Sequence, residues 1–145
     1  MRMLVPTDGS PHAHRAVSFA ARLARELRAA EIILVNVGQI PVLALSAPVA
    51  AGYVVDFAPL EDALESAGHK VLDEAMKAFA GMDVNVARVY RSGEPSAEVI
   101  RTAGESKVDL IVVGARGLGQ IGGLFLGSVS ERILHAAHCP VLVVR

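Results

Sequence analysis

The sequence predicts an α/β fold, in which a parallel sheet is covered by helices on both faces. Five apolar runs rich in β-branched residues alternate with longer segments of helical periodicity, and this alternation is typical of strand–helix–strand units. In addition, 52% of the 145 residues are hydrophobic, which suffices for the buried core of one domain. We therefore expect residues 1–145 to form a single domain with right-handed crossovers between its strands.

Five segments have the composition of strands: residues 2–6, 32–37, 84–90, 108–113 and 141–144. The run at 108–113 is apolar almost throughout, as expected of a buried strand. The segment at 84–90 is apolar partly on one side only, which suits an edge strand. The last segment is short and apolar, and at a sheet edge such a strand invites pairing with another chain.

Start signals and apolar periodicity locate four helices. Ser10 is a favourable N-cap and Pro11 a favourable first helical residue, and apolar residues then recur at helical spacing as far as Leu27. The second helix is expected at 60–79, Glu94 and Pro95 open the third, and the fourth is expected at 129–137. Residues 38–59 form an unusually long connection, which is either a packed surface loop or a lid or partner contact.

Residues 114–128 form a glycine-rich run between the fourth strand and the last helix, and it holds six of the 13 glycines. Backbone N–H groups can approach an anion closely where no Cβ intervenes, and a helix N-terminus adds donors and a favourable dipole. The run therefore either binds phosphate or is a structural loop. Ser128 and Glu131 fit a capping box, so the Ser128 hydroxyl serves the helix, a phosphate, or both.

A second polar loop, at residues 6–10, follows the first strand. Asp8 stands before Gly9 and Ser10, a context in which it either forms an Asx-type turn or faces a ligand. Parallel sheets bind ligands outside the carboxyl ends of their strands, where the strand order reverses. If the first and fourth strands are neighbours, both loops line one crevice. Arg116, inside the glycine run, has the planar guanidinium that suits a phosphate.

Composition and motifs exclude several classes of function. A net charge of −1 and the absence of a basic block argue against nucleic-acid binding. No apolar run is long enough to span a bilayer, and Asp8 ends the first apolar segment too early for a signal peptide, so we expect a cytoplasmic protein. The glycine run lacks the Gly-Lys-Ser/Thr of a P-loop. His135, His138 and Cys139 are too few for a structural zinc site.

Taken together, the motifs resemble the universal stress protein family, in its single-domain, nucleotide-binding form. The family's glycine motif, Gly-x2-Gly-x9-Gly-Ser/Thr, is matched by Gly114, Gly117, Gly127 and Ser128. Residues 4–10 match the family's opening strand and its Asp-Gly/Ser turn. Residues 93–95 resemble the start of its third helix, and residues 139–144 resemble its closing strand. The matches occur in family order and cover essentially the whole chain.

The resemblance implies a Rossmann-like open sheet of five parallel strands in the order 3-2-1-4-5, with ATP bound at the switch point. Mg²⁺ or Mn²⁺ would accompany the ATP if a metal is present. Without the family, Val37 and Val113 are equally well explained as buried strand ends. The implied nucleotide-binding positions are Pro6, Thr7, Asp8, Val37, Val113, Gly114, Gly117, Gly127, Ser128 and Val129, to which Arg116 is added on its chemistry.

The resulting hypothesis is an ATP-binding regulatory stress-response protein without catalytic residues. A slow ATPase or nucleotidyl transferase that uses the same crevice is one alternative, although neither loop contains a lysine to concentrate positive charge at the phosphates. A nucleotide-independent interaction protein is the other. The resemblance also implies a homodimer built through residues 141–144.

Overall fold

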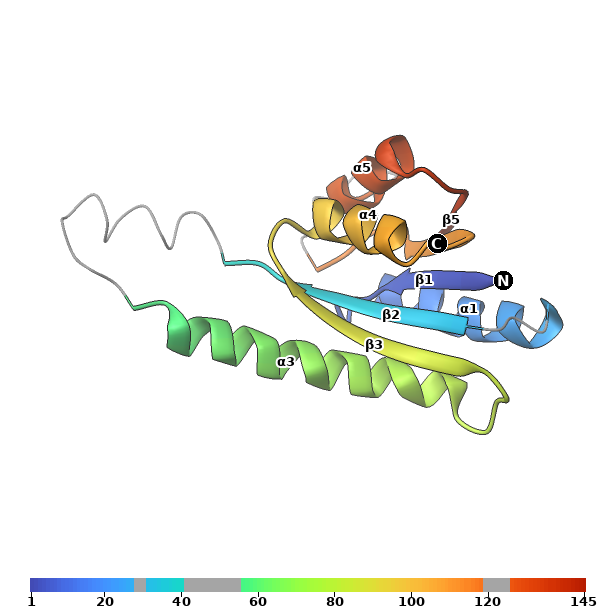
Figure 1. Cartoon of the computed structure of the whole chain (residues 1–145), viewed down its shortest axis with the longest axis horizontal. Helices are drawn as coiled ribbons and strands as arrows, with labels where there is room; N and C mark the ends of the chain where they lie inside the picture. The colour runs from blue at the N-terminus through green and yellow to red at the C-terminus, as the bar shows by residue number, and fades with distance from the viewer. Residues whose placement is uncertain (28–30, 41–55, 119–125) are drawn as a thin grey trace.

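The computed structural model describes residues 1–27, 31–40, 56–118 and 126–145. Its centre is a sheet of five parallel strands in the order β3-β2-β1-β4-β5, which confirms the predicted order (Figure 1). The strands are β1 (Arg2–Pro6), β2 (Glu31–Gly38), β3 (Asn85–Ser92), β4 (Leu110–Gly114) and β5 (Val141–Val144).

The helices are α1 (Pro11–Leu27), α3 (Ala58–Met76), α4 (Pro95–Glu105) and α5 (Ser128–Ala136), and a short 3₁₀ turn, η1 (Lys77–Phe79), extends α3. The segment predicted as one helix at 60–79 is therefore α3 together with η1. Of the long connection at 38–59, residues 41–55 lie outside the described residues. Within the described ranges, no helix is long and apolar enough to cross a membrane.

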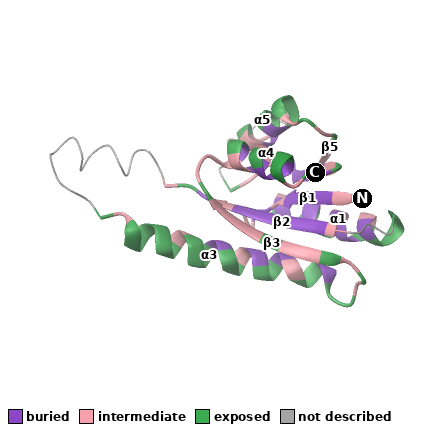
Figure 2. Cartoon of the chain, in the orientation of Figure 1, coloured by how far each residue is buried: buried purple, intermediate pink, exposed green. Residues whose placement is uncertain are grey.

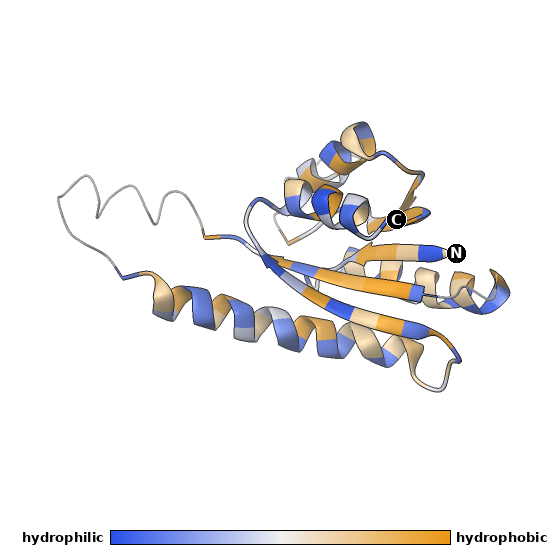
Figure 3. Cartoon of the chain, in the orientation of Figure 1, coloured by the Kyte–Doolittle hydropathy of each residue, from blue (hydrophilic) through white to orange (hydrophobic). Residues whose placement is uncertain are grey.

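Two hydrophobic clusters fill the space between the sheet and its helices. One joins α1 and α3 to Met3 and Val5 of β1, and the other joins α4 and α5 to Leu4 of the same strand. Successive residues of β1 thus serve opposite faces, as the pleat of a strand requires. Figure 2 shows the buried residues along β1 and β2, and Figure 3 shows that hydrophobic residues run along the same central strands.

Position in the sheet decides how far each strand is buried. Met3, Leu4 and Val5 of central β1 have no exposed surface, whereas all four residues of β5 are half-buried. β3 lies at the opposite edge and is half-buried or exposed along its length, which confirms the edge position expected for it. In the described ranges no strand pairs with the outer edge of the apolar β5, which is the edge position considered from the sequence.

The start of β4 differs from the prediction. Val108 is buried, but its N–H donates to the carbonyl of Ala103, 3.1 Å away, and so closes the turn after α4. Regular pairing within β4 begins only at Leu110, opposite Met3. An apolar run cannot distinguish these two roles, because a buried turn residue and a buried strand residue need the same side chain.

Glu94 caps the N-terminus of α4, and its Oε2 accepts hydrogen bonds from Ala97 N at 2.7 Å and from the Ser96 hydroxyl at 2.6 Å. Burial is the largest single influence on its pKa and acts to raise it. The hydrogen bonds from Ser96 and Ala97, with the charge of Arg132, outweigh burial, so the pKa of Glu94 is lowered. A carboxyl whose pKa falls on folding stabilises the protein above its ordinary pKa and loses that contribution as the pH drops.

We therefore expect wild type to have a higher urea midpoint than Glu94→Gln at pH 7. The gap should close as the pH falls below about 4.5, the ordinary pKa of the group. Urea unfolding followed by circular dichroism across that pH range measures it. If the difference between the two urea midpoints stays constant down to pH values near 3, the Glu94→Gln substitution acts through the shape of the side chain and not through its charge.

Candidate functional site

The loops that follow β1 and β4 meet at one edge of the sheet. β1 pairs with β2 on one side and with β4 on the other, so the strand order reverses between β1 and β4. This is the switch point at which open α/β sheets form their ligand crevice. Because β1 and β4 are neighbours, the loop at 7–10 and the glycine run lie side by side, as the sequence predicted.

Asp8 joins the two loops. Its Oδ1 accepts a hydrogen bond from Ser10 N and its Oδ2 accepts one from Leu118 N, both at 2.9 Å. The first bond is the Asx-type turn considered from the sequence. The second reaches across 110 residues of chain to the backbone of the glycine run, and only the tertiary structure shows it. One carboxylate therefore fixes the relative position of both loops.

Different close contacts explain why glycine occurs at three positions of the run. A Cβ on Gly117 would stand 2.5 Å from Asp8 Oδ2, so glycine lets the carboxylate reach the Leu118 N–H. A Cβ on Gly114 would stand 2.7 Å from the backbone carbon and oxygen of His12, so that glycine lets α1 pack against the end of β4. A Cβ on Gly127 would stand 3.2 Å from Arg116 Cα.

The capping prediction was correct at one helix and wrong at another. Ser10 caps α1, since its Oγ accepts a hydrogen bond from Ala13 N at 3.2 Å. Ser128 is not the N-cap of α5, because Gly127 holds that position and Ser128 is the first helical residue. No side chain among the described residues caps this helix, and Ser128 is exposed. The capping box with Glu131 therefore does not form, and the Ser128 hydroxyl is not used as a helix cap.

A pair of serine substitutions tests this assignment. We expect Ser10→Ala to lower the free energy of unfolding by about 1 kcal/mol, because it removes a buried cap. Ser128→Ala serves as the matched control and should change it by less than about 0.5 kcal/mol, since it removes an exposed hydroxyl. Guanidinium unfolding compares the two variants. Equal losses would show that Ser128 also stabilises its helix.

Asn36 contributes to the site in a way that the sequence analysis missed. It is buried within β2, and its side-chain amide donates to the carbonyl of Thr7 at 2.8 Å, while Thr7 N donates to the carbonyl of Val35 at 2.9 Å. These bonds hold the start of the loop at 7–10. The available signal was a single polar residue inside the apolar run at 32–37, since a buried polar side chain needs a partner.

The remaining predicted positions lie around the same edge. Pro6 ends β1 opposite Val35, Val37 is half-buried near the end of β2, and Val113 is buried in β4. Val129 is half-buried and packs against the core beneath α5. The structure thus places all of these residues at the carboxyl ends of strands or at the start of α5. The central part of the glycine run, residues 119–125, lies outside the described residues.

Arg116 lies within the described start of the glycine run and affects its surroundings electrostatically. The pKa of His12 is lowered, first by removal of its ring from water and then by the charges of Arg15 and Arg116. The Arg116 carbonyl accepts a hydrogen bond of 3.5 Å from the Ser10 hydroxyl. This edge of the sheet therefore combines backbone donors, one carboxylate and positive charge.

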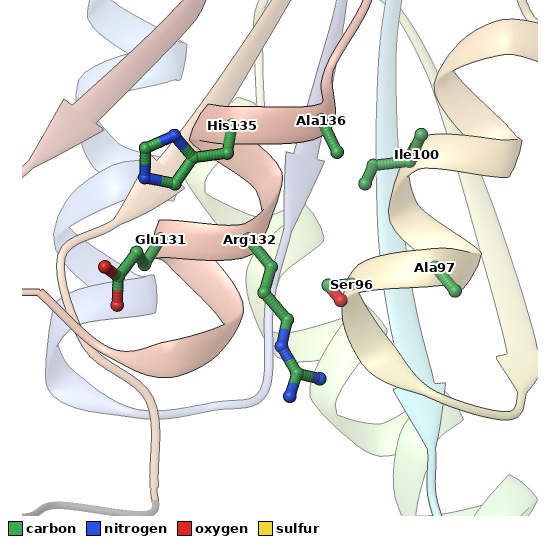
Figure 4. Close-up of a pocket in the computed structure, with 7 residues that line it drawn as sticks. All are labelled: Ser96, Ala97, Ile100, Glu131, Arg132, His135 and Ala136. Atoms are coloured by element: carbon green, nitrogen blue, oxygen red, sulfur yellow. The ribbon is translucent and has the colours of Figure 1, made fainter.

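A groove lies between α4 and α5 (Figure 4). Arg132 of α5 extends along it toward the first turn of α4, and its Nη1 lies 3.1 Å from Glu94 Oε1. His135 also lines the groove. Among the described residues, no group of three or more His, Cys, Asp or Glu side chains could hold a metal ion.

Comparison with known proteins identifies the family. A model of the universal stress protein family matches residues 1–145. The chain belongs to the universal stress protein family. Universal stress protein YxiE of Bacillus subtilis is 35% identical over 146 residues, which cover 99% of this chain and 98% of that protein. The resemblance read from the glycine spacing and the Asp-Gly turn is thereby confirmed.

Solved structures of universal stress proteins share the fold. One from Burkholderia pseudomallei has a TM-score of 0.75 at 30% identity, with coverage of 99% of this chain and 94% of that chain. Another universal stress protein, solved in complex with cAMP, has a TM-score of 0.72 at 28% identity, with coverage of 100% and 97%. The five-stranded sheet and its flanking helices are thus those of the universal stress protein fold.

Proposed function

We propose that this universal stress protein binds ATP at the switch point and acts as a nucleotide-dependent regulatory protein in a stress response. The observation that carries the proposal is the contact between Asp8 and Leu118 N, which holds the loop after β1 and the glycine run together. The related protein solved with cAMP supports an adenine nucleotide as the ligand class. The choice of ATP rests on the glycine spacing, which suits a chain of phosphates.

The roles of the residues follow from their positions. The N-terminus of α5 offers backbone donors and a favourable dipole to an anion, and the exposed Ser128 hydroxyl stands beside them. Gly114, Gly117 and Gly127 let the backbone come close, and Arg116 adds positive charge. Pro6, Thr7, Val37, Val113 and Val129 would form the nucleoside side and the walls of the crevice.

The described residues fit a divalent cation only as a companion of the nucleotide. Asp8 is a single carboxylate, and both of its oxygens already accept backbone hydrogen bonds. Mg²⁺ commonly uses one or two carboxylates together with phosphate oxygens and water. Asp8 would hold such an ion, or Mn²⁺, against the phosphates, and the ion would neutralise part of the phosphate charge.

Calorimetric titration of nucleotide-free protein with ATP tests the proposal, in the presence of Mg²⁺ and in the presence of a chelator. We expect saturable binding, with a tighter dissociation constant when the cation is present. Mass spectrometry of freshly purified protein would identify any nucleotide that copurifies. The proposal fails if the protein carries no nucleotide and shows no heat of binding at millimolar ATP.

We also propose that the protein is a homodimer paired through β5. All four residues of this edge strand are apolar and half-buried, and its outer backbone groups have no strand beside them in the described chain. Symmetric dimers are the commonest oligomers, and an apolar strand edge favours pairing with a second copy. Light scattering at tens of micromolar protein should give the mass of a dimer, and a purely monomeric mass would contradict the proposal.

A further inference from the structure

A groove lined by basic residues runs between α1 and the end of β5. We call it the basic groove, and its lining includes His14, Arg15, Phe19 and Arg22 of α1 together with Val144 and Arg145. None of the described residues that line it is an aspartate or a glutamate. The whole chain carries a net charge of −1, so this concentration of positive charge is local and does not follow from a generally basic composition.

The basic residues near the start of α1 are not explained by the helix dipole. The N-terminal end of a helix favours negative charge, yet the first turn of α1 contains no acidic residue. His12 and His14 lie in this turn, and Arg15 follows directly. The charge of Arg15 is thus available for an interaction other than one with the helix dipole.

The positive charge of the groove comes from its arginines. Arg15 Nη2 donates a hydrogen bond of 2.7 Å to His12 Nδ1, and desolvation, followed by the charges of Arg15 and Arg116, lowers the pKa of His12 and so favours its neutral form. Glu74 of α3 interacts electrostatically with His14 but is already paired with Lys77 at 2.5 Å. The positive charge of the groove would attract an external anion.

The floor of the groove is partly apolar. Phe19 is half-buried, and the guanidinium of Arg22 lies 5.2 Å from the centre of its ring. Arg15 and Arg22 are seven residues apart on one helix and hence about 10 Å apart along its axis. About three residues of an extended peptide span this distance. The dimensions thus match a short peptide segment with both apolar and charged side chains.

We propose that the basic groove is a docking site for an acidic, extended segment of a partner protein. Carboxylates of that segment pair with Arg15 and Arg22, while an apolar side chain packs on Phe19. A nucleic acid fits less well, because Glu74 of α3, which interacts electrostatically with His14, would repel its continuous row of phosphates. The groove is formed by α1 and the end of β5, so the proposal does not depend on nucleotide binding. Because β5 is also the proposed dimer edge, the docking contacts are assigned to Arg15, Phe19 and Arg22 of α1.

Fluorescence anisotropy with a labelled eight-residue peptide of alternating glutamate and valine tests the proposal on the nucleotide-free protein. We expect saturable binding at about 50 mM salt that weakens at higher salt, because the pairs lie at the surface. The double variant Arg15→Gln, Arg22→Gln should bind roughly fivefold to tenfold more weakly, since two partly exposed charge pairs are lost. A peptide of alternating lysine and valine should not bind.

The matched control is Arg101→Gln, Arg132→Gln, which removes the same charge from α4 and α5 on the opposite face of the sheet. It should retain the wild-type affinity within about twofold. Equal weakening in both double variants would overturn the proposal, because it would show a dependence on net charge alone. It would also be overturned if wild type did not bind the peptide, or if a single-stranded oligonucleotide competed for the groove at lower concentration than the peptide.

Discussion

Gly114→Val is expected to lower the free energy of unfolding by about 3 kcal/mol, the upper part of the range for an overpacked core. A Cβ at this position would stand 2.7 Å from the carbonyl carbon and oxygen of His12 and 2.9 Å from Ala13 N. These are backbone atoms at the start of α1, so no rotamer change can make room for it. Either α1 or the end of β4 has to move. Chemical denaturation with a two-state fit measures the loss.

Gly104→Ala is the control, because glycine at this position has no close neighbour. It lies in α4, and a Cβ there would meet nothing within 4 Å. Alanine should therefore stabilise the helix by roughly 0.5–1 kcal/mol, through its better helix propensity. If Gly114→Val were no more destabilising than typical surface substitutions, the close contact between α1 and β4 would be wrong. The structural reason for Gly114 would then fail, and a role in ligand binding would have to explain it.

Asp8→Ala and Gly117→Ala are each expected to weaken ATP binding by roughly tenfold, and the double variant should be little weaker than either single one. Both changes break the same contact. The first removes the carboxylate that accepts from Leu118 N, and the second puts a methyl group 2.5 Å from Asp8 Oδ2 and displaces it. When two residues act through one interaction, either substitution removes that interaction, so the second substitution causes little further loss of ATP affinity. Calorimetric titration of the four proteins gives the coupling free energy.

Asp8→Asn separates positioning from charge in the same experiment. Asparagine has a single acceptor oxygen, so it can keep the hydrogen bond from Leu118 N only by losing the one from Ser10 N, and it carries no charge to attract a cation. If Asp8 acts mainly by positioning the loop, this variant should bind ATP nearly as well as wild type in a chelator. Additive losses of ATP affinity in the double-mutant cycle of Asp8 and Gly117 would mean that the two residues act separately. The contact between Asp8 and Leu118 N would then have no part in ATP binding.

Most of the fold could be predicted because each element carries its own local signal. Ser10 and Pro11 mark the start of α1, and β1 and β5 have the predicted bounds. Errors fall at boundaries where one residue type serves two structures. Val108 is apolar and buried in either case, and only its hydrogen bond to Ala103 shows that it belongs to a turn.

The residues of the candidate site could largely be predicted from the sequence, but the contacts that explain why each residue is needed could not. The sequence indicated Asp8 and Gly117 as members of one crevice, but it did not show that the glycine is needed for the carboxylate to reach Leu118 N. The capping pattern placed the N-cap of α5 at Ser128, whereas the structure places it one residue earlier, at Gly127. Asn36 carried no motif, because its partner is a backbone carbonyl in another strand.

The sequence by itself determined the order of strands and helices, the family, and the two loops that form the candidate site. These depend on local periodicity, on turn chemistry and on the spacing of a few residues. Only the tertiary structure decided which atoms meet: Asp8 with Leu118 N, Gly114 with the backbone of α1, and the basic side chains of α1 with the end of β5. Such contacts join residues far apart in the chain. They arise from the pairing of β1 with β4 and of β4 with β5, which local patterns do not specify.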